Sequence, residues 1–362
     1  MYAESEQETL ADAGSRIAGE GARAPVAAAL NGTSRPLRKS AAVRWLRGYN
    51  ELGVALALGL MVAVVGIAHP RFLEVFSLAN VAQQASFYGF MALAMVFLLA
   101  MGELDLSVGG IYVLSILITA ILIQDGVDPW IGAVLCIAIG AGLGGINGVI
   151  ANALRVPVII VTLGTLSAYR GLGLIVSGSN SVGDQPLDHS FYRIAGGAYF
   201  KVPASVWLFV IATIVLSILF TKTRFGFAVR AIGANREAAR LSGYPIGRIR
   251  VLATMLVGAL AGLSAAVTLA FFGAADPNLG TGYELQVIAA AIIGGTSITG
   301  GSGSVVGAFM GALIISVIGA GLIQFGVSSE WSVFVTGVII VGAVALDALV
   351  RRRRGVRGLR VG

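Results

Sequence analysis

Long apolar stretches recur along almost the whole chain, and they constrain its fold more than any other feature. A helix needs about 20 mostly apolar residues to cross a bilayer, and clear candidates lie at 51–68, 86–102, 107–123, 130–150, 157–177, 204–221, 250–273, 303–323 and 331–350. A tenth stretch, 284–296, is shorter and interrupted by glycine. The sequence therefore predicts an all-α polytopic membrane protein with about 10 transmembrane helices, with eight as the alternative.

The composition agrees with this prediction and excludes other classes of protein. Charged residues make up 12% of the 362 residues, whereas soluble domains have about 25%. So little polar surface cannot cover a soluble core made from a chain that is 57% hydrophobic. A soluble enzyme, a disordered protein and a disulfide scaffold are therefore excluded, the last because Cys136 is the single cysteine.

The positions of Lys and Arg predict the orientation of the chain. With ten spans and a cytoplasmic amino terminus, 21 of the 25 Lys and Arg residues fall inside and three outside. Cytoplasmic loops carry such an excess of positive charge, so both termini are expected in the cytoplasm. The chain then divides into a flexible cytoplasmic tail (1–48), a transmembrane domain (49–350) and a basic cytoplasmic tail (351–362). Because topology accounts for the net charge of +7, nucleic acid is not an expected partner.

One cytoplasmic loop, 222–250, is much longer than the others and carries seven basic residues and one acid, Glu237. Asn235 is suited to cap a short helix, Gly243 to end it, and Pro245 to prevent its continuation. A helix of about two turns is not stable alone. The loop is therefore either a solvated connector or a segment that a cytoplasmic partner protein holds in place.

Within this loop, Glu237-Ala238-Ala239 followed by Gly243 resembles the coupling segment of the membrane subunits of ATP-binding-cassette (ABC) importers. Two longer blocks resemble the ribose-type sugar permease family. MGELDLSVGG at 101–110 is similar to that family's Gly-Gly-Ile-Asp-Leu-Ser-Val-Gly block, and 280–313 is similar to its second long block. Glu103 stands where the family commonly has glycine, which leaves the local backbone and the substrate preference open.

Shorter blocks between these two follow the order of the same family, namely Asn147-Gly148, Pro157 through Thr165, and Arg170-Gly171. The resemblance covers about residues 50–350. It implies the permease subunit of an ATP-driven, binding-protein-dependent importer in the bacterial plasma (inner) membrane. Such a subunit moves a neutral monosaccharide or similar polyol inward by alternating access.

The resemblance also implies partners. These are a cytoplasmic ABC ATPase, a second permease subunit (a homodimer or a close paralogue) and an extracytoplasmic sugar-binding protein. ATP and magnesium are expected on the ATPase, and this chain is expected to hold no cofactor or metal and no catalytic residue. The residues implied to couple to the ATPase are Asn235, Arg236, Glu237, Ala238, Ala239, Arg240, Ser242 and Gly243.

The residues themselves also argue against an enzyme. A phosphate-binding loop requires Gly-Lys before Ser or Thr, and none of Lys39, Lys201 and Lys222 follows a glycine. His69 and His189 both fall in predicted outside loops, so no histidine base is available inside the membrane. ATP hydrolysis is therefore expected on another chain.

An ion-coupled secondary transporter or a channel is the alternative function. Ion coupling depends on ionisable groups buried in spans, and the candidates are Glu103, Asp105, Arg170, Glu284 and Asp347. Glu103, Glu284 and Asp347 lie near predicted span ends, where they are expected to reach water. Asp105 and Arg170 lie deeper and are expected to pair across helices. Such a set makes a poor proton relay, and the coupling-type loop favours the importer.

Most other polar side chains in the spans are neutral, which favours a neutral polyol as substrate because hydroxyls and amides exchange hydrogen bonds with sugar hydroxyls. The alternative for Ser and Thr is that they bond their own or a neighbouring helix. The segments 101–110 and 297–304 are expected to line the path, because irregular backbone at membrane depth is tolerated beside protein or a water cavity. The predicted substrate path contains Asp105, Ser107, Asn147, Thr162, Thr165, Arg170, Gln286, Thr296 and Ser297.

Glycines at four-residue spacing predict close helix packing. One set shares a helix face at Gly140, Gly144 and Gly148, and a second set comprises Gly303, Gly307 and Gly311. Their contacts are expected either within one chain or across a dimer.

Overall fold

The computed structural model describes residues 41–328, 331, 334–335, 337–338 and 341–342, with side chains described from residue 51 onward. The chain divides into two units at Gly48 and Tyr49, and the fold below is that of the second unit. The predicted span 331–350 lies largely outside the described residues, as do most of the tail 1–48 and all of the tail 351–362.

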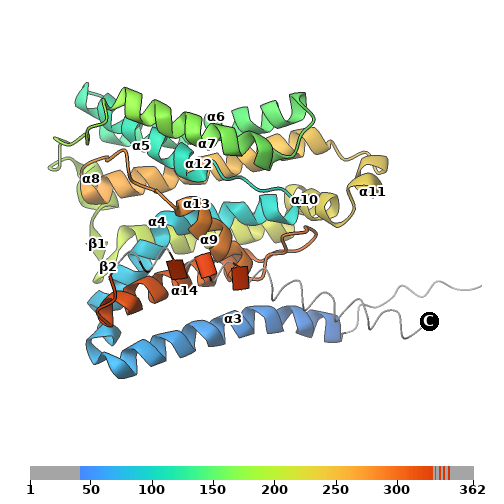
Figure 1. Ribbon diagram of the computed structural model, residues 1–362, viewed down its shortest axis with the longest axis horizontal. Helices are drawn as coiled ribbons and strands as arrows, with labels where there is room; N and C mark the ends of the chain where they lie inside the picture. The colour runs from blue at the N-terminus through green and yellow to red at the C-terminus, as the bar shows by residue number, and fades with distance from the viewer. Residues whose placement is uncertain (1–40, 329–330, 332–333, 336, 339–340, 343–362) are drawn as a thin grey trace, which may run out of the picture. The chain divides into compact units, whose positions relative to one another are not determined.

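The regular structure of the described chain is almost all helical (Figure 1). Its short elements are a 3-10 helix, η1 (Pro70–Leu73), and a two-residue antiparallel hairpin, β1 (Ala198–Tyr199) with β2 (Val202–Pro203). The helices are α3 (Ala41–Ala68), α4 (Val75–Ala100), α5 (Val108–Gln124), α6 (Pro129–Ala153), α7 (Val158–Val176), α8 (Ser190–Ala195), α9 (Ala204–Lys222), α10 (Arg224–Ala234), α11 (Arg236–Leu241), α12 (Ile246–Phe272), α13 (Tyr283–Ile293) and α14 (Val305–Gln324).

Seven of the described helices are long and apolar enough to cross a membrane, namely α3, α4, α6, α7, α9, α12 and α14. The helices α5 and α13 are apolar but shorter. An all-α polytopic membrane fold is therefore confirmed. The predicted brevity of 284–296 is also confirmed, because α13 ends at Ile293 and Gly295 follows with a φ of 86°.

One predicted boundary is wrong. The second span was expected from residue 86, but α4 begins at Val75. Its first turns carry Gln83 and other polar residues, which lower the local hydropathy, yet Gln83 is buried inside the fold. The helix α12 begins at Ile246, directly after Pro245, so the last residues of the predicted cytoplasmic loop 222–250 are helical.

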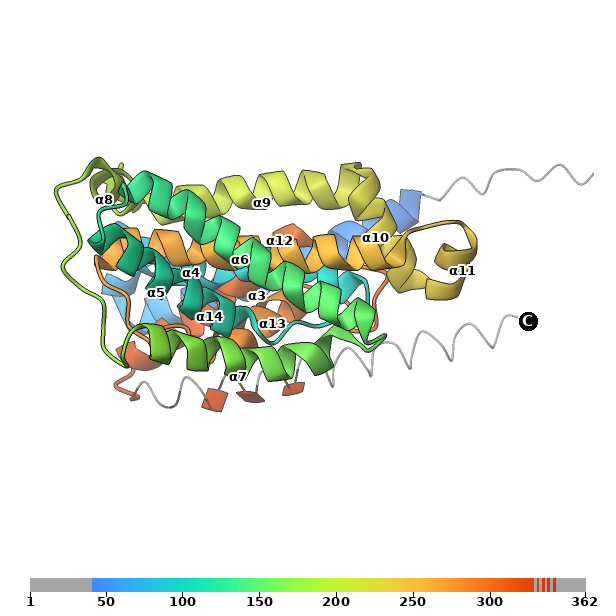
Figure 2. The ribbon, with the colours of Figure 1, turned by 90° about the horizontal axis from the view of Figure 1, so that it is seen from above.

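The core is built around α4. Every residue from 85 to 100 is buried, and α4 contacts α9, α12, α13 and α14 (Figures 1 and 2). By contrast, only 11% of the apolar part of α3 is buried. A helix that is apolar on every side is either enclosed by protein or faces lipid. The outer helices expose large apolar side chains that a bilayer would cover, including Leu60, Ile160, Leu163, Ile211 and Ile214.

The glycine sets bring helices together within one chain. A Cβ atom at Gly140 would overlap the backbone of Gly258 in α12, and one at Gly144 would overlap the carbonyl of Thr254. We call Gly140, Gly144, Gly148 and Gly258 the α6–α12 seam. In α14, Gly311 packs in the same way against the backbone of Ala290 in α13, and Gly307 against that of Gly294, directly after α13. Gly303 precedes α14 and lies against Val96 and Thr296.

The connections between helices gather at two ends of the bundle (Figure 1). The α8 end holds η1, α8, the hairpin and 273–282. A bridge between Val182 and Ala275 joins the α7–α8 connection to 273–282. The α11 end holds 101–107, 154–157, α10, α11 and 294–304. The basic residues of the described chain concentrate at the α11 end, which includes Arg155, Lys222, Arg224, Arg236, Arg240 and Arg248.

Candidate functional site

Two segments interrupt the helices at the α11 end. The first broken segment, 101–107, joins α4 to α5, and Gly102 has a φ of 73° that favours glycine. The second broken segment, 294–304, joins α13 to α14. The two lie against each other, because a Cβ atom at Gly300 would come within 3.1 Å of the backbone nitrogen of Gly102. Next to them, the N–H of Gly301 donates to the carbonyl of Ala100, the last residue of α4, over 2.9 Å. Two regions far apart in the sequence therefore form one irregular zone.

Asp105 in the first broken segment organises a buried polar cluster. Its Oδ1 accepts hydrogen bonds from the backbone N–H of Ser107 over 2.7 Å and from the Ser107 hydroxyl over 2.6 Å. The Asn147 amide of α6 donates to Ser107 Oγ over 2.7 Å, and the Tyr169 hydroxyl of α7 donates to Asn147 Oδ1 over 3.0 Å. Asp105, Ser107 and Asn147 are fully buried. The structure thus joins three predicted path residues and adds Tyr169, which sequence reasoning missed.

One oxygen of this cluster remains available. Asp105 Oδ2 is buried and has no hydrogen-bond partner among the described residues. On α7, Thr162 Oγ1 accepts from the N–H of Leu106 over 3.2 Å. The hydroxyl of Thr165, also on α7, is buried and has no hydrogen-bond partner among the described residues. Buried polar atoms are normally hydrogen-bonded, so these two unpaired oxygens are candidates for contact with a polar ligand.

The second broken segment supplies a further set of polar groups. Thr296 and Ser297 are buried, and Thr296 Oγ1 has no hydrogen-bond partner among the residues with described side chains. Gln286 of α13 is half-buried. These residues come from a different helix pair than the Asp105 cluster.

The expected pairing of Asp105 with Arg170 is wrong. Arg170 of α7 pairs instead with Glu284 of α13 over 3.1 Å and donates to the carbonyl of Gly280 over 3.3 Å. Gly109 of α5 makes room for this pair, because a Cβ atom there would overlap a carboxylate oxygen of Glu284. Glu284 therefore neutralises Arg170 inside the bundle rather than facing open water, with its side chain 13% exposed.

Glu103 also differs from the expectation that it reaches water. Its side chain is 4% exposed and accepts from Arg250 of α12 over 2.5 Å and from Arg236 of α11 over 3.1 Å. Its other carboxylate oxygen accepts from the N–H of Val158, at the start of α7, over 2.9 Å. The sequence places Glu103 near the end of a predicted span, but it does not reveal that α7, α11 and α12 all contact its side chain. Asp347 lies outside the described residues.

The predicted short helix of the long loop is confirmed as α11. The Asn235 side chain accepts from the N–H of Ala238 over 3.0 Å, and Gly243 ends the helix with a φ of 81°. Glu237 and Arg240 form an exposed ion pair of 2.7 Å, which raises the pKa of the Arg240 guanidinium above its ordinary value. The short helix is therefore capped at both ends and presents charges to water.

Sequence reasoning missed α10, the helix before α11. Its buried residues Gly226, Ala228, Val229 and Ile232 follow helical spacing, which was the available signal. The same loop exposes two large apolar side chains, Phe227 at 57% and Leu241 at 79%. Exposed apolar side chains of this kind are candidates for contact with a protein partner.

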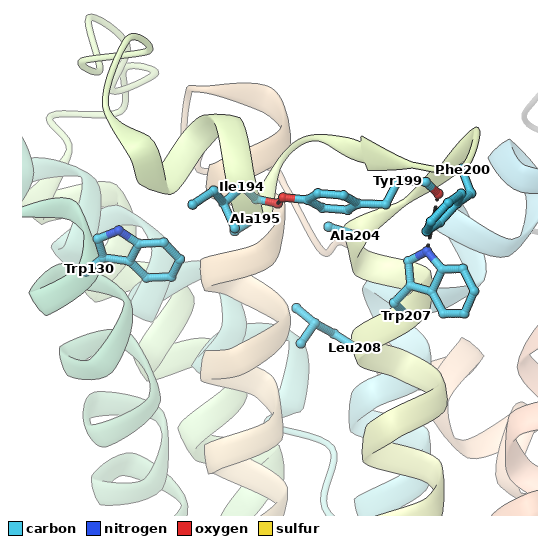
Figure 3. A pocket seen from close by; sticks show the side chains of 8 residues that line it. All are labelled: Trp130, Ile194, Ala195, Tyr199, Phe200, Ala204, Trp207 and Leu208. Atoms are coloured by element: carbon cyan, nitrogen blue, oxygen red, sulfur yellow. Dashed lines mark hydrogen bonds between the residues drawn. The ribbon is translucent and has the colours of Figure 1, made fainter.

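A cavity of about 490 Å³ lies at the opposite, α8 end (Figure 3). Its walls are apolar or aromatic and come from α6, α8, the hairpin and α9. Figure 3 shows the Trp207 indole directed toward the Tyr199 carbonyl, a hydrogen bond of 3.5 Å. None of the predicted path residues lines this cavity. Tryptophan and tyrosine at helix ends are typical of the membrane–water interface.

Comparisons with known proteins agree with this arrangement. Residues 77–344 match the family described as the permease component of branched-chain amino acid transport systems. The chain is 37% identical to the ribose import permease protein RbsC of Bacillus subtilis (strain 168), over 82% of this chain and 92% of that protein. It is 33% identical to RbsC of Escherichia coli (strain K12), over 84% and 94%.

A third relative is the D-allose transport system permease protein AlsC of Escherichia coli (strain K12), which is 34% identical over 84% of this chain and 93% of that protein. No solved structure matches the chain.

Proposed function

The chain belongs to the family of ABC importer permeases that includes the ribose import permeases, and from that premise we propose that its substrate is a neutral monosaccharide or similar polyol. It is a multi-pass inner-membrane protein and the permease subunit of a binding-protein-dependent importer. The ATPase of such an importer is a separate chain. The proposal of a sugar substrate is supported by the names of the relatives, which specify ribose and allose.

The chemistry of the buried polar groups supports a neutral substrate. Arg170 is neutralised by Glu284, and Glu103 is held by arginines, so the buried Arg250 and the partly buried Arg170 each already have a carboxylate partner. Asp105 Oδ2, Thr165 Oγ1 and Thr296 Oγ1 are unpaired oxygens in the described structure. Carboxylate and hydroxyl oxygens accept hydrogen bonds from sugar hydroxyls. The predicted path residues are therefore proposed to contact the substrate as it passes.

The observation that carries the function is α11 itself. It is capped by Asn235, ended by Gly243, and exposes Leu241. Its first residue, Arg236, pairs with Glu103 of the first broken segment. We propose that the residues from Asn235 to Gly243 dock on the cytoplasmic ATPase. Ala239 is buried against the permease and Arg236 pairs with Glu103, and the exposed remainder faces the partner. Motion of the ATPase would then reach the irregular backbone of the path directly.

The complete assembly is proposed to contain a second permease subunit, either an identical copy or a close paralogue. Ten spans with both termini in the cytoplasm fit the charge distribution. In the described chain, successive helices alternate between the α8 end and the basic α11 end. This alternation agrees with an inside α11 end and an outside α8 end.

The central test is reconstitution. In liposomes, the permease with its ATPase and sugar-binding protein is expected to accumulate a monosaccharide only when ATP is supplied, because this chain contains no phosphate-binding loop. Labelled ribose, allose and arabinose serve as probes. Uptake by the permease alone under an imposed proton or sodium gradient would instead support an ion-coupled secondary transporter. Uptake with neither ATP nor a gradient would support a channel.

The orientation has its own test. In a Cys136→Ser background, Asp188→Cys at the α8 end is expected to react with an impermeant maleimide in intact cells, because Asp188 is exposed there. Ser242→Cys at the α11 end is expected to react only after permeabilisation, although Ser242 is equally exposed in the structure. Labelling of Ser242→Cys from outside would contradict the proposed topology.

A further inference from the structure

We propose that Glu103 is a positioning residue that transmits movement of α11 to the first broken segment through its ion pair with Arg236. This inference rests on the proposed docking of α11 on the ATPase. The ion pair joins Arg236 of α11 to Glu103, which lies two positions before Asp105. It is thus a direct contact between the proposed docking surface and the proposed substrate path.

The two arginines that hold Glu103 differ in exposure. The Arg250 side chain is 6% exposed, whereas that of Arg236 is 54% exposed. Arg250 also donates to Asn152 Oδ1 over 3.1 Å and to the Val156 carbonyl over 3.4 Å. These extra bonds fix Arg250 to the connection between α6 and α7. Arg236 has no such anchor in the described structure, so its pair with Glu103 is the one that can break and reform.

Arg236 is not needed to neutralise Glu103. A buried carboxylate requires a compensating positive charge, and Arg250 already supplies one at 2.5 Å. The second guanidinium therefore adds a link between elements without being required to bury the acid. A link of this kind is expected to affect the coupling of α11 more than the folding of the chain.

Glu103 is connected to the path on its other side as well. Its second carboxylate oxygen accepts from the N–H of Val158 at the start of α7. The same helix carries Thr162, which accepts from the N–H of Leu106. A displacement of Glu103 consequently changes the position of the segment that contains Asp105 relative to α7.

A close backbone contact beside the ion pair provides a fixed point. Gly233, near the end of α10, packs so tightly that a Cβ atom would overlap the Ala100 carbonyl and approach the N–H of Gly301. The end of α10 is therefore in close backbone contact with the end of α4 and with the second broken segment. With that point held, tilting of α11 acts on the Arg236–Glu103 pair.

The experiment uses the complete importer in liposomes. The stimulation of ATP hydrolysis by sugar-loaded binding protein is divided by the amount of ATPase bound to the permease. Arg236→Gln and Glu103→Gln are each expected to lower this ratio about fivefold or more, the range of typical coupling between sites. Arg236→Lys, which keeps a positive charge, is expected to restore most of the ratio.

Two further variants separate coupling from other effects. Arg248 lies at the α11 end, is exposed and has no ion-pair partner among the described residues. Arg248→Gln is therefore expected to leave the ratio of stimulated ATP hydrolysis to bound ATPase unchanged. The double variant Arg236→Gln/Glu103→Gln is expected to lose no more than the worse single variant, because both remove the same contact.

Several outcomes would overturn the inference. One is a normal ratio in Arg236→Gln, and another is a loss explained wholly by weaker ATPase binding. Additive losses in the double variant would also overturn it. If Glu103→Gln fails to fold because Arg250 loses its partner, Arg236→Gln still decides the matter. If the wild-type permease neither binds nor stimulates the ATPase, the proposed function itself fails.

Discussion

Replacing Gly140 by leucine is expected to abolish the stable fold of this protein. Gly140 lies in the α6–α12 seam, where a single Cβ atom would already overlap the backbone of Gly258. Backbone atoms cannot move aside as the end of a side chain can, so α6 and α12 must separate. Overpacking costs about 1–3 kcal/mol in ordinary cores. A larger cost is expected here because α12 also packs against α4 at the centre of the bundle.

The matched control lies two residues away in the same helix. Gly142 is exposed and a Cβ atom there would meet no atom within 4 Å. Gly142→Leu is therefore expected to keep or raise the melting temperature, since glycine costs a helix about 0.8–1.0 kcal/mol relative to alanine. The measurement is the yield and thermal stability of detergent-solubilised protein by fluorescence-detected size exclusion. Equal melting temperatures for Gly140→Leu and Gly142→Leu would contradict the prediction that the α6–α12 seam requires glycine at position 140.

Replacing Gly243 by valine is expected to lower transport about tenfold while the permease still folds. The φ of 81° at Gly243 is strained for any L side chain, although a Cβ atom there would meet no neighbour. The left-handed region costs about 1–2 kcal/mol outside glycine, and more for a β-branched residue. With about 1.4 kcal/mol per factor of ten, the docked geometry of α11 is expected to be populated roughly tenfold less.

A conservative variant at the same position is the control. Gly243→Asn is expected to retain most of the transport, because asparagine visits the left-handed region more readily. Glu237→Lys is expected to lose transport for a different reason, because it breaks the ion pair with Arg240 and places a positive charge in the first turn of α11. Expression, co-purification of the ATPase and sugar uptake are measured together. Full ATPase association and uptake in both Gly243→Val and Glu237→Lys would reduce the loop to a connector.

Local features of the sequence predicted the helices well. Apolar length identified the described spans, and the cap residues Asn235 and Gly243 identified α11, since capping depends on residues within one turn. The start of α4 was missed because its first turns are polar in composition yet buried by tertiary contacts around Gln83. The α6–α12 seam was anticipated as a packing face, but its partner helix was not.

The sequence by itself determined that the chain is helical, lies in a membrane and presents a short capped helix in a basic loop. Hydropathy, charge and capping are properties of neighbouring residues, which makes them readable along the chain. Only the tertiary structure decided the partners of the buried charges. Arg170 meets Glu284, and Glu103 meets Arg236 and Arg250, because packing brings together residues more than 100 positions apart. No local pattern specifies such pairs, since each depends on how several helices cross.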